Sequence, residues 1–140
     1  MVLFIICIFT MSSIAYVMTG FSPQQEGLKF PESFIIDYEL NPFVENELLA
    51  RGFTIFKINY TVMDPMLEGY IDNLPETYTT SYGNIQVIVQ KLLSNQTSLV
   101  VTGPYDEVIV DNITRESILD SLCRTLFYTP PECGLLNITD

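Results

Sequence analysis

A chain of 140 residues accommodates one domain with a short appendage, and a hydrophobic content of 48% is enough to build a packed core. Seventeen acidic residues outnumber six basic ones, and the formal charge of −11 argues against nucleic acid or an anionic membrane surface as a partner. The sequence contains no histidine, which removes Ser-His-Asp and Cys-His catalysis and His-ligated metal sites. We therefore expect neither an enzyme nor a cofactor.

The N-terminal segment, residues 1–19, decides the compartment. Residues 2–11 form an apolar block, and the small side chains of Ser13 and Ala15 match the pattern that precedes a signal-peptide cleavage site. The rival interpretation is an uncleaved anchor, because residues 2–18 reach the lower length limit of a membrane-spanning helix. A third interpretation is a buried core helix. We expect a signal peptide or a signal-anchor that tethers the chain to a membrane.

The remaining chain begins with a linker and continues as one domain. Residues 20–33 are rich in Gly, Pro and Ser and predict a linker, followed by a single domain at 34–140. Alternating apolar and acidic side chains predict a half-buried strand at 34–40. A helix is predicted at 42–51, because Asn41 is a good N-cap, a proline follows it and a glycine comes directly after the helix.

The middle of the chain contains a strand, a long connection, an ambiguous segment and a hairpin. Alternation predicts a strand at 53–62, and the connection at 64–83 contains two prolines and predicts a surface loop with a helical turn. Residues 84–95 fit both helical and strand spacing, and their length favours a helix. Residues 98–112 predict two strands around the turn Gly103-Pro104.

The clearest helix begins after Thr114. Its apolar side chains from Ile118 to Phe127 form one stripe, with charged side chains opposite, and a final edge strand is predicted at 135–139. From residue 53 onward the order is strand, helix, strand, strand, helix, strand. The predicted fold is therefore α+β, a ferredoxin-like βαββαβ sandwich preceded by an extra strand and a short helix, with the N-terminal leader or anchor helix in front.

Four Asn-x-Thr acceptor triplets for N-glycosylation begin at Asn59, Asn95, Asn112 and Asn137, whereas chance predicts about 1.3 triplets at this composition. Alternation in the strand places Asn59 opposite the apolar face, so that a glycan there would point to water. Thr114 completes the triplet of Asn112 and is also the N-cap. Both roles are compatible, because the sugar modifies the Asn amide and the cap uses the Thr oxygen.

Cysteine usage fits an oxidising compartment. Cys7 lies in the leader, which leaves Cys123 and Cys133, ten positions apart, as an even pair. A disulfide between them is favoured, and two buried reduced thiols are the alternative. One pair without histidine is not a zinc pattern.

Two segments resemble those of SEA domains, the extracellular modules of membrane mucins and adhesion receptors. They are GFTIFKINYTVMDP at 52–65 and ITRESILDSL at 113–122, and the similarity covers about residues 52–140. The resemblance implies a ferredoxin-like fold, glycosylation and placement near a membrane. Many SEA domains cleave themselves at a Gly-Ser turn. The matching turn here, Thr102-Gly103-Pro104-Tyr105, has no serine, so self-cleavage is expected to be absent.

We expect a small secreted or membrane-tethered glycoprotein that binds another protein without catalysis, outside the cell or in the lumen of the secretory pathway. The alternative is an N-terminally anchored structural subunit of a viral envelope or organelle membrane. A third hypothesis is an acid-base enzyme that uses the carboxylates of Asp106, Glu107 and Asp111 near the hairpin. Charged hairpin faces are usually only solvated, and no calcium-loop motif is present.

Overall fold

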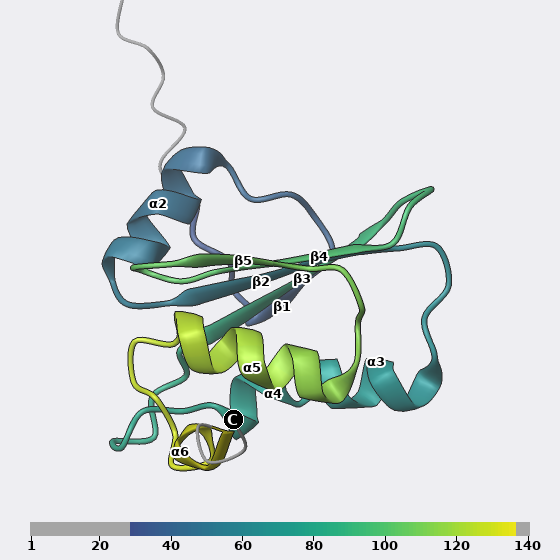
Figure 1. Ribbon diagram of the computed structural model, residues 1–140. Coiled ribbons are helices and arrows are strands. Elements are labelled where there is room, and N and C mark those ends of the chain that lie inside the picture. The colour runs from purple at the N-terminus through teal and green to yellow at the C-terminus, as the bar shows by residue number, and fades with distance from the viewer. Residues whose placement is uncertain (1–28, 137–140) are drawn as a thin grey trace, which may run out of the picture.

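The computed structural model describes residues 29–136, which form an α+β domain around one five-stranded mixed sheet (Figure 1). The strands are β1 (Ile35–Ile36), β2 (Thr54–Tyr60), β3 (Val87–Leu93), β4 (Ser98–Thr102) and β5 (Glu107–Val110). The helices are α2 (Pro42–Ala50), α3 (Pro65–Asp72), α4 (Leu74–Thr77), α5 (Arg115–Thr125) and α6 (Cys133–Leu136). The signal peptide or signal-anchor predicted at 1–19 and the triplet at Asn137 lie outside the described residues.

Strand β2 lies at the centre of the sheet, whose order is β1-β3-β2-β4-β5. β3 runs parallel to β2 on one side and β4 runs antiparallel on the other, so that Phe56 of β2 lies opposite both Val89 and Val101. β1 pairs in parallel with β3, and β5 closes the other edge as an antiparallel hairpin with β4. The chain passes from β2 to β3 through α3 and α4, on one face of the sheet (Figure 1).

Helices cover the two faces of the sheet unequally. The larger core lies against α3, α4 and α5, and its fully buried members include Phe56, Ile58, Ile71, Leu74, Val89, Leu99, Ile118 and Leu122. The smaller core lies against α2 and contains Ile36, Leu40, Val44, Leu48, Ile55 and Ile88. α2 covers only one half of its face (Figure 1). Ile109 of β5, which lies opposite Val100 of β4, stays exposed. Each face therefore has its own helix layer.

Both long predicted helices with strong caps are confirmed. The side-chain oxygen of Asn41 accepts a hydrogen bond from the backbone N–H of Phe43 at 2.9 Å, at the start of α2. Thr114 accepts one from the N–H of Ser117 at 3.2 Å, and the Ser117 hydroxyl returns a bond to the Thr114 backbone, which completes a capping box. The hairpin of β4 and β5 is also as predicted.

The prediction of a helix at 84–95 is wrong, because most of this segment forms β3. Residues 86–90 are all buried, since β3 lies between two strands and has helices on both faces. A strand that is buried on both sides shows a continuous apolar run in place of alternation. Because such a run places apolar residues at neighbouring positions, it also fits the spacing of a helix.

The ferredoxin-like order is not confirmed. In a split βαβ unit the two strands joined by a helix are separated by another strand, whereas β2 and β3 are direct neighbours here. The described order from residue 53 is strand, two helices, three strands and two helices. The final edge strand predicted at 135–139 is wrong for residues 135 and 136, which belong to α6. The predicted α+β class is confirmed.

The connection predicted at 64–83 contains two helices where one helical turn was expected. The carboxylate of Asp64 accepts a hydrogen bond from the N–H of Met66 at 3.3 Å, and Pro65 occupies the first helical position of α3. This is the same cap-and-proline arrangement that begins α2. Recognition of it at Asp64 would have predicted α3.

Candidate interaction site

Three of the four predicted glycosylation triplets lie at the same end of the sheet, which we call the triplet end. Asn59 is next to the last residue of β2 and lies opposite Ser98 at the start of β4. Asn95 lies in the connection from β3 to β4, which projects beyond the sheet (Figure 1). Asn112 follows β5, whose last residue, Val110, lies opposite Leu99 of β4. Sequence positions that are far apart thus converge on one end.

The three asparagines differ in exposure. Asn95 and Asn112 are exposed. Asn59 is half-buried, and its Nδ2 donates a hydrogen bond to Oγ of Ser98 at 3.0 Å. A glycan on any of the three would extend away from both cores, as glycans on folded domains do.

The turn between β5 and α5 uses Asn112 and Thr114 in separate ways. The Ser117 hydroxyl donates to the backbone carbonyl of Asn112 at 2.6 Å, and the Thr114 hydroxyl caps the helix. The side-chain amide of Asn112 takes no part in the cap. The geometry therefore leaves this amide free for a sugar while the helix start is complete.

The predicted disulfide between Cys123 and Cys133 is present and joins α5 to α6, with their Cα atoms 5.4 Å apart. It encloses the segment 124–132, which carries two exposed aromatic residues, Phe127 and Tyr128. The bond therefore restrains the segment that contributes Phe127 and Tyr128 to an exposed aromatic surface.

That surface is a group of three exposed aromatic side chains, Tyr105, Phe127 and Tyr128, at the opposite end of the sheet from the triplets. We call it the aromatic end. The Tyr105 ring stacks on Phe127 with centroids 5.9 Å apart, and Tyr128 meets Phe127 edge-on at 4.8 Å. Their exposed fractions are 81%, 42% and 47%, respectively. Such rings in contact are worth about 0.5–1.5 kcal/mol per pair beyond area burial.

Hydrogen bonds from the sheet fix the segment that carries Phe127 and Tyr128. Nε2 of the buried Gln86 donates to the Tyr128 carbonyl at 2.9 Å, and Oε1 accepts from the Tyr128 N–H at 3.1 Å. The hydroxyl of Thr54 donates to the carbonyl of Thr125 at 3.1 Å. These bonds satisfy backbone groups that would otherwise be orphaned past the end of α5.

Two glycines determine the course of the backbone at the aromatic end, one through a close contact and one through its backbone conformation. A Cβ at Gly103 would overlap the backbone carbonyl of Thr125, so that no larger residue fits there. Gly52 has φ +88°, a conformation that favours glycine, and the Phe127 ring lies 3.5 Å from where its Cβ would be. The aromatic end therefore needs glycine at both positions, at Gly103 because of the close contact and at Gly52 because of the backbone conformation.

An open groove of about 360 Å³ runs beside the rings of Tyr105 and Phe127. Its remaining lining is mostly apolar and comes from the end of α2 and from the hairpin turn: Asn46, Leu49, Ala50, Gly52 and Pro104. A groove bordered by exposed aromatic rings and short side chains suits the binding of another molecule.

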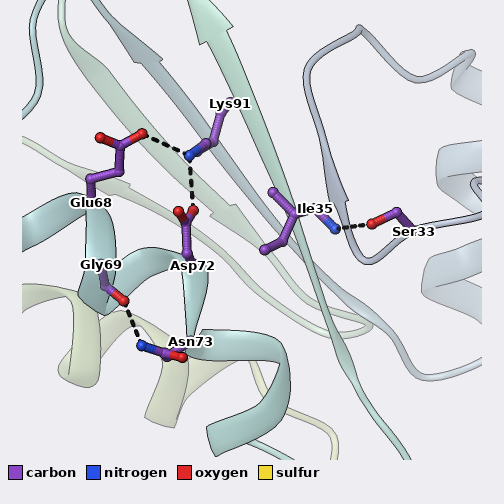
Figure 2. Close-up of polar contacts among 7 residues, drawn as sticks. All are labelled: Ser33, Ile35, Glu68, Gly69, Asp72, Asn73 and Lys91. Carbon is purple, nitrogen blue, oxygen red and sulfur yellow. Dashed lines mark hydrogen bonds and ion pairs between the residues drawn. The ribbon is translucent and has the colours of Figure 1, made fainter.

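A polar cluster on the opposite side of the sheet from α2 is structural. Figure 2 shows Nζ of Lys91 between the carboxylates of Asp72, at 2.8 Å, and Glu68, at 3.0 Å. Burial by itself lowers the pKa of Lys91, but hydrogen bonds to Asp72 and Glu68 outweigh it and raise the pKa above its ordinary value. A lysine that stays charged cannot act as a nucleophile or base at neutral pH. The cluster therefore attaches α3 to β3.

The three hairpin carboxylates proposed for acid-base chemistry are not brought together. Asp106 pairs with Arg124 at 3.3 Å, and Glu107 accepts a hydrogen bond from the Thr102 hydroxyl at 3.1 Å. Asp111 lies beyond the far end of β5, near the triplets. Within residues 29–136, no group of three His, Cys, Asp or Glu side chains is arranged to hold a metal ion.

No helix within the described residues is long and apolar enough to cross a membrane. Comparisons of the chain with protein-family models, with curated proteins and with solved structures find no match.

Sequence reasoning found the triplets and the disulfide and missed the aromatic end. Tyr105 and Phe127 are 22 positions apart in the sequence, and only the folded sheet brings them together. The proline before Tyr105 and the glycine before that marked a turn but gave no sign of its neighbour. A local signal for this surface was therefore absent.

Proposed function

We propose that this chain is an N-glycosylated domain of the cell exterior or the secretory lumen, secreted or tethered by residues 1–19, that binds another protein at its aromatic end. The observation that carries the proposal is the placement of three acceptor triplets and three exposed aromatic side chains at opposite ends of the sheet, in a domain that also contains a disulfide.

The separation of the two ends supports a division of roles. β2 spans seven residues between them, which corresponds to about 20 Å. A glycan is bulky and solubilising, and on Asn59, Asn95 or Asn112 it would shield the triplet end. The aromatic end, at the other end of the sheet, would then stay accessible.

The aromatic end has the composition of a protein-binding surface. Tyr and Phe supply large contact areas at a low cost in conformational entropy, and the bonds from Gln86 to Tyr128 hold them before a partner arrives. Truncation of one buried anchor in such a surface typically costs more than 1 kcal/mol of binding. The chain's charge of −11 favours a partner whose facing surface is basic, chiefly through the rate of association.

Expression in cells with a secretory pathway tests compartment and modification together. The expected product is secreted or exposed on the cell surface, loses mass on enzymatic removal of N-glycans, and loses one glycan in each of the variants Asn95→Gln and Asn112→Gln. A chain recovered from the cytosol with bare asparagines and free thiols would overturn the proposal.

Phe127→Ala tests the binding surface, with Phe43→Ala as the matched control. Phe43 is an exposed phenylalanine on α2 that does not line the groove. Chemical cross-linking on intact cells, followed by mass spectrometry, should recover a partner with the parent chain and with Phe43→Ala, and at least about tenfold less with Phe127→Ala. Equal recovery with both variants would place binding elsewhere.

The alternative proposal is an anchored structural subunit of a membrane assembly. It is favoured by the run of seventeen uncharged residues at 2–18, and the resemblance to SEA domains also implies placement near a membrane. Sequencing of the mature N-terminus distinguishes the two. A chain that begins at Tyr16 has lost its leader, whereas one that keeps the segment 2–18 is anchored.

A further inference from the structure

Tyr38 combines an exposed phenol with a carboxylate on each side. It lies in the loop from β1 to α2 and is 49% exposed, and the neighbouring Asp37 and Glu39 are both exposed. Within residues 29–136, neither carboxylate forms an ion pair. Tyr38 is therefore a phenol between two carboxylates that form no ion pair within the described residues.

The other described tyrosines lack one of these properties. Tyr78 is buried, and Tyr82, although 85% exposed, has the uncharged neighbours Ser81 and Gly83. The tyrosines at 60, 70 and 128 have no charged neighbour in sequence either.

Tyr105 is the nearest competitor. Asp106 and Glu107 follow it, but Asp106 is paired with Arg124 at 3.3 Å and its other neighbour is a proline. The Tyr105 ring is also stacked on Phe127. Its surroundings are therefore less anionic and its ring is less free than that of Tyr38.

The loop presents Tyr38 in a defined position. Nε2 of the buried Gln90 donates a hydrogen bond to the Tyr38 carbonyl at 3.0 Å, while the phenolic hydroxyl makes no hydrogen bond with any described residue. Together with Asp37, Tyr38 lines an open groove of about 480 Å³. The backbone is thus fixed and the hydroxyl is accessible from solvent.

We infer that Tyr38 is an acceptor for O-sulfation in the secretory pathway, an inference that rests on the proposed function for its compartment. The donor is an activated sulfate, a mixed anhydride of sulfate with a nucleotide phosphate. Because this donor is polyanionic, an enzyme that binds it has a cationic active site, which attracts an anionic acceptor segment. Asp37 and Glu39 supply that charge at Tyr38.

The transfer conserves atoms and electrons. The phenolic oxygen of Tyr38 forms a bond to the sulfur while the bond from sulfur to the anhydride oxygen breaks, and the nucleotide phosphate leaves with the electron pair. The phenolic proton passes to a base of the transferase. The product is a sulfate ester with a permanent negative charge, which would strengthen the attraction of this surface for a basic partner.

Trypsin separates the relevant tyrosines. Cleavage after Lys29 and Arg51 gives peptide 30–51, whose only tyrosine is Tyr38 and which contains no glycosylation triplet. Cleavage after Lys91 and Arg115 gives peptide 92–115, whose only tyrosine is Tyr105 and which contains the triplets of Asn95 and Asn112. One digest therefore reports sulfation and glycosylation independently.

The full chain is expressed in secretory cells, treated to remove N-glycans and digested for mass spectrometry. Peptide 30–51 is expected to carry the mass of one added SO3 group, to resist phosphatase, and to lose the group when chlorate in the medium blocks formation of the donor. An unmodified peptide 30–51, a phosphatase-sensitive group, or a sulfate on Tyr105 in its place would overturn the inference.

Variants separate the tyrosine from its charged context. Tyr38→Phe should abolish the added mass, and Asp37→Asn with Glu39→Gln should reduce it at least about fivefold although Tyr38 is kept. The matched control Tyr82→Phe should leave it unchanged. Glycosylated peptide 92–115 beside unmodified peptide 30–51 refutes only the inference, whereas absence of both modifications refutes the proposed function as well.

Discussion

The triplet end and the aromatic end differ in how the sequence encodes them. Each triplet is three consecutive residues, so Asn95 carries its signal whatever the fold. The aromatic end forms only when the turn between β4 and β5, the segment after α5 and Gly52 come together in the folded chain. A modification site can thus be recognised from a few consecutive residues, whereas an exposed aromatic surface in the same domain depends on tertiary contacts.

Replacement of Gly103 by alanine should have the largest effect and should act at the aromatic end. The new Cβ would overlap the carbonyl of Thr125, a backbone atom that cannot rotate away. We expect the free energy of unfolding to fall by at least about 3 kcal/mol, measured by urea denaturation.

The control is Gly69→Ala in α3, where nothing lies within 4 Å of the added Cβ. Alanine has the higher helix propensity, so this variant should be more stable by up to about 1 kcal/mol. If the two substitutions change the free energy of unfolding equally, the close contact at Gly103 does not stabilise the aromatic end.

Removal of the disulfide by the double change Cys123→Ser and Cys133→Ser should cost about 2.5 to 3 kcal/mol, because it frees a loop of ten residues in the unfolded chain. Hydrogen exchange should accelerate in the segment 124–136, while amides of β2 keep their relative protection. Equal acceleration at both ends would show that the bond stabilises the whole domain and not the aromatic end.

Thr114 and Asn112 allow the two roles of the triplet end to be separated. In protein made without glycans, Thr114→Ala should lower the free energy of unfolding by about 1 kcal/mol through loss of the cap. Asn112→Gln should change it by less than about 0.5 kcal/mol, since its amide takes no part in the cap. In glycosylating cells, however, both variants should lose the same glycan, and Thr114→Ser should keep both roles.

A modest effect is expected for Lys91→Met, a substitution that lies at neither of the two ends. Since Glu68 and Asp72 are partly exposed, we expect the free energy of unfolding to fall by at most about 1 kcal/mol near neutral pH. The folded-state pKa of Lys91 is raised, so its contribution is complete below the unfolded value of about 10.4 and is lost as pH rises through the folded value.

Denaturation of Lys91→Met and the parent chain from pH 6 to pH 11 measures this dependence. The difference in free energy of unfolding should stay constant up to about pH 10 and shrink above it. A difference that shrinks toward acid pH alone would assign the dependence to the carboxylates.

Where the chain's own end signals are strong, its elements could be predicted from sequence. Asn41 with its following proline, and Thr114 as an N-cap, place the starts of α2 and α5 correctly, because caps act within a few residues. β3 could not be identified in this way, since a run of apolar residues that is buried on both faces, Val87 to Val89, fits helical spacing as well as alternation. Its partner strands lie more than 30 positions away and leave no local trace.

In the candidate site, too, the disulfide could be predicted from sequence and the groove could not. Cys123 and Cys133 pair as predicted, because an even count and a short spacing leave one choice within the domain. The groove beside Phe127 depends on a glycine from before β2 and a proline from the hairpin turn. No spacing rule links those positions, so the groove could not be predicted before the sheet order was known.

The pairing of β2 with β4 also affects how long Asn59 stays accessible during synthesis of the chain. Ser98, which accepts the hydrogen bond of Asn59, follows it by 39 positions. At about 5–20 residues per second, the ribosome needs roughly 2–8 s to reach Ser98 after it has passed Asn59. In a nascent polypeptide that enters a lumen N-terminus first, the Asn59 amide therefore has several seconds of free exposure to a sugar-transferring enzyme before β4 arrives and half-buries it.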